Sequence, residues 1–142
     1  ILVGFPGETE DDIEVCARFI QETKPEKLAL FSYSPEEGTS AFALKSSVSS
    51  REAARRVNFL REEHLKVLSE IHRARVGKTY RCLVDEIQGD SILARRFQDA
   101  PEVDEAVFLP KDLKVKAGDI LDVEITSFFE YDMTGVPAEK KS

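Results

Sequence analysis

Glycine, proline and acidic residues lie together near the start of the chain, where an apolar run ends. The stretch VGFPGE (3–8) follows Ile1 and Leu2. In α/β proteins, ligands bind beyond the carboxyl ends of the strands, and glycine lets the backbone approach a ligand closely. Several acids and no lysine surround this turn, which disfavours a phosphate site and is more compatible with a purine that carries a ribose or an amino-acid tail. The alternative is a tight turn that begins a helix.

Aromatic and acidic side chains follow a second apolar run, KLALFSYS (27–34). Phe31 and Tyr33 could wall a ligand pocket or pack in a core, and the sequence supports both. Glu36 and Glu37 come next, in a loop with proline and glycine. General acid–base catalysis needs a carboxyl group with a tuned pKa at the substrate, whereas adjacent acids in such a loop are more often a solvated surface. We predict no catalytic residue here; the functional alternative is recognition of a basic protein loop.

The second half of the chain is acidic. Residues 77–137 contain seven basic and thirteen acidic residues, a formal net charge of −6, and the whole chain carries −7. RNA binding requires Lys and Arg to neutralise phosphates, so this balance favours a basic protein partner over RNA. A generic acidic surface is the alternative. Arg95 and Arg96 form a small basic patch that leaves some room for RNA.

Three aromatic residues, Phe128, Phe129 and Tyr131, lie near the last predicted turn. Exposed aromatic rings there could stack on bases or grip a protein partner. We expect at least two of the three to lie in the core.

The two cysteines and two histidines form no metal-binding spacing. Cys16 and Cys82 are far apart, and neither His64 nor His72 has a second ligand nearby in the sequence. We therefore predict no metal site and two inert core thiols. Two thiols are compatible with a reducing cytoplasm. No apolar run approaches the roughly 20 residues that span a bilayer.

The pattern of apolar residues predicts a fold that combines an α/β part with an all-β part. The runs 1–5 and 27–34 flank a helix that Thr9 caps, and two strands joined by a helix form a parallel βαβ unit. Apolar residues at spacings of three and four predict a long helix over 49–76. From Gly77, short strand-like runs alternate with turn residues, which is typical of a small antiparallel β-barrel.

Two stretches resemble a known enzyme family. LVGFPGETEDD (2–12) and FSYSPEEGTSA (31–41) are similar to the end of the radical-SAM barrel in the methylthiotransferases. The region from residue 77 resembles the TRAM module of these enzymes, a five-stranded, OB-like barrel. The YSPEEGT loop and the segment DAPEVD (99–104) are similar to the RimO branch, which modifies an aspartate of a small-subunit ribosomal protein. The branch that modifies tRNA usually has Arg in place of a Glu in that loop and lacks the Asp-Ala-Pro-Glu segment.

The resemblance implies three parts: the end of a radical-SAM barrel (1–48), a linker helix (49–76) and a TRAM domain (77–142). It also implies that the chain is the C-terminal fragment of a longer enzyme. The parent would hold two 4Fe-4S clusters on cysteines that this sequence does not contain, so we expect the fragment alone to be inactive. In the parent, S-adenosylmethionine would yield a radical that removes hydrogen from the β-carbon of the aspartate, and a methylthio group would be added there.

The resemblance also implies site residues. The strand ends would lie beside the adenosine part of S-adenosylmethionine, in a pocket that is only partly present. The expected cofactor-binding residues are Val3, Gly4, Phe5, Phe31 and Tyr33. The expected substrate-docking residues are Glu36, Glu37, Asp99, Glu102 and Asp104.

Two other functions remain open. One is a tRNA-adenosine methylthiotransferase whose barrel grips an anticodon stem, although the acidic balance and the Glu36–Glu37 loop speak against it. The other is a non-enzymatic binding module in which only the barrel matters. A native gene without upstream cluster cysteines would favour the binding module.

Overall fold

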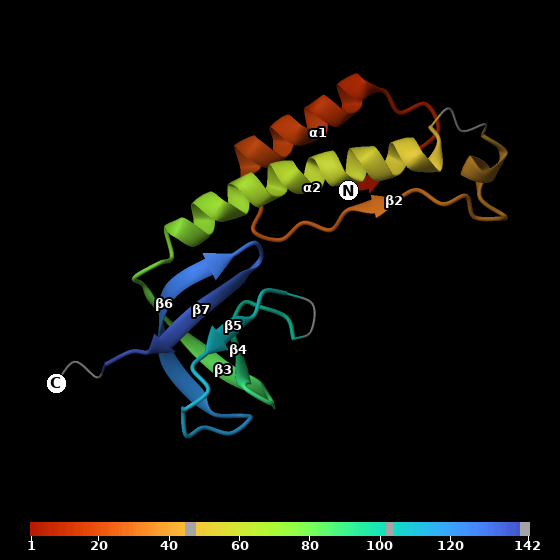
Figure 1. Ribbon diagram of the computed structural model, residues 1–142. Coiled ribbons are helices and arrows are strands. Elements are labelled where there is room, and N and C mark those ends of the chain that lie inside the picture. The colour runs from red at the N-terminus through yellow and green to blue at the C-terminus, as the bar shows by residue number, and fades with distance from the viewer. Residues whose placement is uncertain (45–47, 102–103, 140–142) are drawn as a thin grey trace. The chain divides into compact units, whose positions relative to one another are not determined.

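The computed structural model describes residues 1–44, 48–101 and 104–139 (Figure 1). The chain divides into two compact units, Ile1–Leu68 and Ser69–Ser142. The first unit contains two short strands and helices, and the second contains a β-barrel. Helix α2 (Ser50–Arg73) crosses the division between the units, so that its last turn belongs with the barrel.

The first unit starts with a parallel pair of strands joined by a helix. Its elements before α2 are β1 (Leu2–Val3), α1 (Glu10–Thr23), β2 (Phe31–Ser32) and a short 3-10 helix, η1 (Ser40–Ala43). Leu2 lies opposite Phe31 in the parallel ladder, as the βαβ pattern predicts. Strand β2 is much shorter than the predicted run 27–34, because β1 offers only a few backbone groups for pairing. No closed barrel of parallel strands is present in the described part of the chain.

Helix α1 begins at a capping box. The Thr9 hydroxyl accepts a hydrogen bond from the N–H of Asp12 at 3.3 Å, and the Asp12 carboxylate accepts one from the N–H of Thr9 at 2.8 Å. These bonds satisfy N–H groups that the first turn of a helix leaves without partners. Ile13, Ala17 and Ile20 form the buried face at helical spacing, which confirms the predicted helix.

Helix α2 buries the apolar stripe that the sequence predicts. Val57, Leu60, Val67 and Leu68 are all buried. His64 shares this face, and its Nε2 lies 2.9 Å from the carbonyl oxygen of Pro25. The stripe therefore packs against the chain around α1, and His64 has a structural role in that contact.

Five strands close into a barrel in the second unit. They are β3 (Thr79–Gln88), β4 (Ser91–Arg96), β5 (Val107–Leu109), β6 (Ile120–Phe129) and β7 (Asp132–Pro137). Their order around the barrel is β3-β4-β5-β7-β6. Four neighbouring pairs are antiparallel, and β5 pairs with β7 in parallel. The prediction of an antiparallel barrel is therefore wrong at one seam: five strands cannot alternate in direction all the way around a closed ring.

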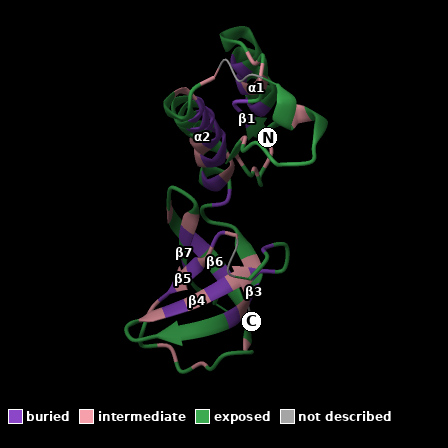
Figure 2. Ribbon diagram, turned by 90° about the vertical axis from the view of Figure 1, so that its right-hand side faces the viewer, coloured by how far each residue is buried: buried purple, intermediate pink, exposed green. Residues whose placement is uncertain are grey.

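The barrel core follows from the alternation of side chains along its strands. Along β4, buried positions alternate with half-buried ones (Figure 2). The core consists of Cys82, Val84, Ile92, Ala94, Val107, Leu109, Val123, Ile125 and Met133. Side chains at the alternate positions lie on the outer wall. In neither unit does the described chain include a helix long and apolar enough to cross a membrane.

Candidate functional site

The backbone at the end of β1 is engaged within the chain. Gly4 has a φ of +89°, a conformation that favours glycine. Its N–H donates to both carboxylate oxygens of Glu8, at 2.9 and 3.0 Å. The carbonyl oxygen of Val3 accepts a hydrogen bond from the N–H of Tyr33 at 2.7 Å, and the Val3 side chain is fully buried. The N–H of Gly4 and the carbonyl oxygen of Val3 therefore both have partners within the chain.

Helix α2 packs closely on this turn. A Cβ atom built on Gly4 would lie 2.8 Å from the Cβ of Ala53, a distance that real side chains do not tolerate. Close packing and positive φ together explain the glycine without a ligand. They support the interpretation of the stretch as a tight turn that leads into a helix, whereas its contact with a cofactor stays a prediction.

An arginine of α2 balances the acids at the turn. The buried Arg56 guanidinium lies 2.8 Å from Glu8, 2.7 Å from Glu10 and 3.1 Å from Glu52. Hydrogen bonding to Glu8 raises the pKa of Arg56. The pKa of Glu52 falls to about 2, chiefly through its hydrogen bonds with Arg55 and then Arg56. Local patterns could not predict the pairing of Arg56 with Glu8 and Glu10, because these acids lie 48 and 46 residues away in the chain.

Aromatic rings form the accessible part of the strand ends. Phe31 is 63% exposed and Phe5 is 39% exposed. The rings of Phe5 and Tyr33 meet edge to face, with centroids 5.1 Å apart. The Tyr33 hydroxyl is buried and has no hydrogen-bond partner among the described residues. Phe5 and Tyr33 therefore meet just beyond the ends of the two strands, whereas Phe31 is the first residue of β2 and lies opposite Leu2.

The loop after β2 carries its two acids on the surface. Glu36 and Glu37 are both exposed. The carbonyl of Glu36 accepts hydrogen bonds from the backbone N–H of Thr39 at 3.3 Å and from its hydroxyl at 2.7 Å, which fixes the turn. The role of these two carboxylates in docking remains a prediction.

A buried charge cluster lies where β4 leaves the barrel. The Arg96 side chain is 1% exposed. Its Nε and Nη2 donate to the two carboxylate oxygens of Asp99, each at 2.8 Å, and Nη2 also donates to Glu105 at 2.7 Å. The predicted surface patch of Arg95 and Arg96 is therefore wrong, because Arg96 takes an inward position on β4 and its charge is balanced inside the protein.

The acidic segment after β4 is divided between interior and surface. Asp99 is buried and bound to Arg96, which argues against a role in docking. Asp104 is half-buried, and its carboxylate accepts a hydrogen bond from the N–H of Ala100 at 2.7 Å. Glu102 lies outside the described residues. Of the three residues predicted here, Asp104 is the one that the structure describes with a partly exposed side chain.

The charge cluster extends to the last turn of α2. His72 is fully buried, and its Nε2 lies 3.7 Å from a carboxylate oxygen of Glu105. The His72 ring also meets Phe128 edge to face, with centroids 5.5 Å apart. The helix end is thus attached to the barrel by both a polar and an aromatic contact. Sequence reasoning missed this role of His72, because its partner is 33 residues away.

The aromatic residues at the β6–β7 turn are mostly exposed. Phe128 packs on the barrel core, but Phe129 is 78% exposed and Tyr131 is 36% exposed. The expectation that at least two of the three lie in the core is wrong. Phe129 follows the core-packed Phe128 on β6, so the alternation of side chains along the strand places it on the outer face.

The cysteines have structural positions. Cys82 belongs to the barrel core, and burial raises its pKa to about 11. Cys16 is half-buried on α1, and burial raises its pKa as well. Both shifts disfavour the reactive thiolate at neutral pH. Within residues 1–44, 48–101 and 104–139, no group of three or more His, Cys, Asp or Glu side chains is arranged to hold a metal ion.

A comparison with protein families identifies the domain to which the barrel corresponds. Residues 76–137 match the TRAM domain family. The match begins beside the last turn of α2 and ends with β7. The second unit is therefore a TRAM domain.

Several proteins are similar to this chain along nearly its whole length. The chain is 48% identical over 135 residues to the ribosomal protein uS12 methylthiotransferase RimO of Leptospira biflexa, which covers 94% of this chain and 30% of that protein. It is 38% identical to the RimO of Thermodesulfovibrio yellowstonii, over 95% of this chain and 32% of that protein. The RimO of Colwellia psychrerythraea is 39% identical, over 97% and 30%. The chain belongs to the RimO-like methylthiotransferase family and spans about 30% of the length of these relatives.

Proposed function

We propose that this chain is the part of a radical-SAM methylthiotransferase that carries the substrate-docking module. The enzyme would add a methylthio group to the β-carbon of an aspartate in the ribosomal protein uS12, in the cytoplasm. The observation that carries the proposal is the 48% identity, along 94% of the chain, to a protein named for this activity on uS12. Because the chain spans 30% of that relative, the chemistry belongs to the whole enzyme and the fragment alone would be inactive.

We assign a different role to each of three parts of the chain. We assign 1–48 to the end of a radical-SAM barrel, 49–76 to a linker helix and 77–142 to the docking TRAM domain. The parallel pair of β1 and β2 supports the first assignment. The hydrogen-bonded turn at Gly4 and the Arg56 cluster would keep the strand ends in place while substrate and cofactor exchange.

The strand ends fit the wall of an S-adenosylmethionine pocket. When bound, the cofactor supplies the radical and the methyl group, and 4Fe-4S clusters held elsewhere in the enzyme supply electrons and sulfur. Phe5 and Phe31 offer exposed ring surface on which an adenine could pack. The buried Tyr33 hydroxyl has no partner in the described chain, so a polar group of a ligand would satisfy it. These three side chains would bind and orient the adenosine and exclude water.

The acidic TRAM domain would dock a basic protein. Its charge of −6 over residues 77–137 opposes the binding of phosphates and favours cationic partners. Arg96 is buried together with Asp99 and Glu105, so the remaining residues of this range still carry a net charge of −5. A tRNA substrate has one observation in its favour, the exposed ring of Phe129, which could stack on a base.

A binding experiment with the 142-residue chain tests the proposal. Purified uS12 and a tRNA anticodon stem-loop would each be titrated at low and at physiological salt. We expect binding to uS12 that persists at physiological salt, and little binding to the stem-loop. Salt-sensitive binding to the stem-loop alone would overturn the proposal in favour of a tRNA substrate, because electrostatic RNA binding falls steeply with salt.

A further inference from the structure

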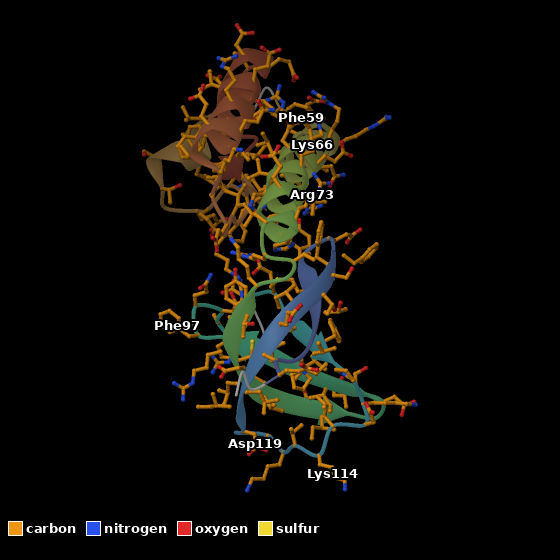
Figure 3. The ribbon with its side chains drawn as sticks, turned by 90° about the vertical axis from the view of Figure 1, so that its left-hand side faces the viewer. Phe59, Lys66, Arg73, Phe97, Lys114 and Asp119 are labelled. Atoms are coloured by element: carbon orange, nitrogen blue, oxygen red, sulfur yellow. The ribbon has the colours of Figure 1, made fainter. Side chains whose placement is uncertain are left out.

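The outer wall of the barrel carries an apolar groove on β3, β4 and the start of β6. The groove has a volume of about 220 Å³, and its apolar lining includes Leu83, Phe97 and Ile120. Phe97 is 92% exposed and Ile120 is 56% exposed. Figure 3 shows the Phe97 side chain projecting away from the barrel. Large apolar side chains gathered on an exposed wall mark an interaction site more often than isolated ones do.

The pairing of the strands places the residues of the groove side by side. Leu83 of β3 lies opposite Arg95 of β4 on one side and opposite Ile120 of β6 on the other. These three side chains therefore form one row across the outer wall, since paired residues in a sheet point to the same face. Phe97 directly follows the last residue of β4. The groove is thus built on rigid strands.

A β-bulge places two carboxylates beside the groove. The register between β3 and β4 shifts between Val84 and Glu86, and such a shift re-aims side chains. As a result Asp85 and Glu86, although consecutive, both line an adjoining hollow of about 610 Å³. Arg95 lines both the hollow and the groove. The two depressions therefore adjoin at Arg95.

Charge around the groove is negative on balance. Arg95 is neutralised by Asp85, at 2.9 Å. Arg81 is exposed, and Asp122 lies opposite it in the β3–β6 ladder. Two more carboxylates lie close in the chain, Glu86 beyond the bulge and Asp119 before Ile120. The rim residues are Asp85, Glu86, Asp119 and Asp122 against Arg81 and Arg95. This balance suits a cationic occupant and opposes a phosphate backbone.

We propose that this surface is the docking face for a basic protein. An apolar side chain of the partner would pack on Phe97, Leu83 and Ile120, and a neighbouring Lys or Arg would lie over Asp85 and Glu86. The inference rests on the proposed function of the barrel as a docking module and names the face that it uses. An aromatic anchor with a charged rim is the arrangement in which a few residues dominate binding, while the rim governs association and specificity.

Two exposed phenylalanines of the same barrel allow a matched test. The 142-residue chain would carry Phe97→Ala or, as the control, Phe129→Ala, and binding to purified uS12 would be measured at physiological salt. We expect Phe97→Ala to raise the Kd about tenfold or more, as for a central anchor, and Phe129→Ala to change it less than about twofold. Both side chains are largely exposed, so unchanged far-UV circular dichroism would verify that neither variant unfolds.

Two exposed glutamates test the rim in the same way. Glu86 lies beside the groove, and Glu130 lies at the β6–β7 turn. Glu86→Gln should weaken binding to uS12 about threefold at low salt, mainly through the association rate, and less at high salt. Glu130→Gln removes the same charge elsewhere on the barrel and should have a smaller effect.

The possible failures are distinguishable. If the unaltered chain binds uS12 and Phe97→Ala binds equally well, this surface is not the docking face, although the docking function survives. If the unaltered chain does not bind uS12, the proposed function and the inference both fall. If Phe97→Ala instead lowers binding to the stem-loop RNA, or dissociates a dimer of the chain in sedimentation, the groove has another occupant and the inference is wrong.

Discussion

Arg56 in the first unit and Arg96 in the second are both buried, but water has different access to their carboxylate partners. The Arg56 side chain is 7% exposed, and its partners Glu8, Glu10 and Glu52 are 12%, 57% and 33% exposed. The Arg96 side chain is 1% exposed, and its partner Asp99 is 0% exposed. If Arg56 is lost, water can solvate Glu10 and Glu52, and Glu8 keeps its hydrogen bonds from the Gly4 N–H. Where the partners are dry, as at Arg96, loss of the cation leaves buried charge.

The two arginines also differ in what they join. Arg56 connects α2 to the turn before α1, across 46 residues or more of sequence. Arg96 holds a local segment, because Asp99 and Glu105 are three and nine residues away. The Arg56 cluster joins segments that are distant in sequence at a partly solvent-accessible site. The Arg96 cluster joins residues of one local loop at a buried site. Unequal responses to substitution follow from this difference.

The largest effect is expected from Arg96→Met. Asp99 and Glu105 would remain buried without their cation, which costs about 3–5 kcal/mol. A small domain has a total stability of only about 5–15 kcal/mol, so much of the barrel should open. Hydrogen exchange measured by mass spectrometry on peptides of β4 and β5 would detect the loss of protection, while α1 should be less affected.

The neighbouring Arg95→Met is the matched control. Arg95 pairs with Asp85, whose side chain is 33% exposed, so its loss should cost about 1 kcal/mol or less. Equal loss of protection in the two variants would contradict the idea that burial, and not the removal of an arginine as such, sets the size of the effect.

A smaller effect is expected from Arg56→Met in the first unit. It removes hydrogen bonds between charged groups, but Glu10 and Glu52 keep access to water, so we expect a loss of about 1.5–3 kcal/mol. Hydrogen exchange in α1 and in the first turns of α2 would report it. Arg55→Met, in which the lost side chain is 55% exposed, should leave protection close to that of the unaltered chain. A loss for Arg56→Met that matched the loss for Arg96→Met would remove the contrast between the units.

The smallest effect is a pH dependence in the first unit. Arg55 and Arg56 lower the pKa of Glu52 from its usual value of 4.5 to about 2. A carboxyl group with a depressed pKa in the folded state stabilises the fold above its unfolded pKa. That contribution is lost as the pH falls from about 4.5 towards about 2. The difference in thermal stability between the unaltered chain and Glu52→Gln should therefore shrink across this range.

Glu62→Gln serves as the control for the acid titration. Glu62 is exposed on the same helix, and no ion pair joins it to another described residue. Its substitution should leave the pH dependence unchanged. A difference between the unaltered chain and Glu52→Gln that stayed constant from pH 7 to pH 2 would show that the ion pairs of Glu52 do not stabilise the fold.

Local patterns in the sequence predicted the elements well. The capping residue Thr9 and the spacing of Ile13, Ala17 and Ile20 locate α1 correctly, because capping and amphipathicity are encoded within a few residues. The stripe through Leu60 and Leu68 likewise identifies the buried face of α2. Family resemblance, confirmed by the relatives, added the barrel that periodicity only suggested.

Features that depend on distant partners could not be predicted in this way. Nothing in the sequence near Arg56 or His72 indicates that each faces a carboxylate dozens of residues away. The burial of Arg96 did have a local signal, since it occupies an inward position on β4 and an acid follows three residues later. The exposure of Phe97 and Phe129 had none, because hydrophobic residues are assigned to the core by default and the strand exits decide otherwise.

Closure of the barrel through the parallel β5–β7 seam restricts how the domain can evolve new partners. Every strand has a neighbour on both sides, so no free edge is available for a partner to extend the sheet. A partner of the barrel would therefore have to be recognised by side chains on the outer wall. A change of partner would therefore require substitutions on this wall and no change of the backbone.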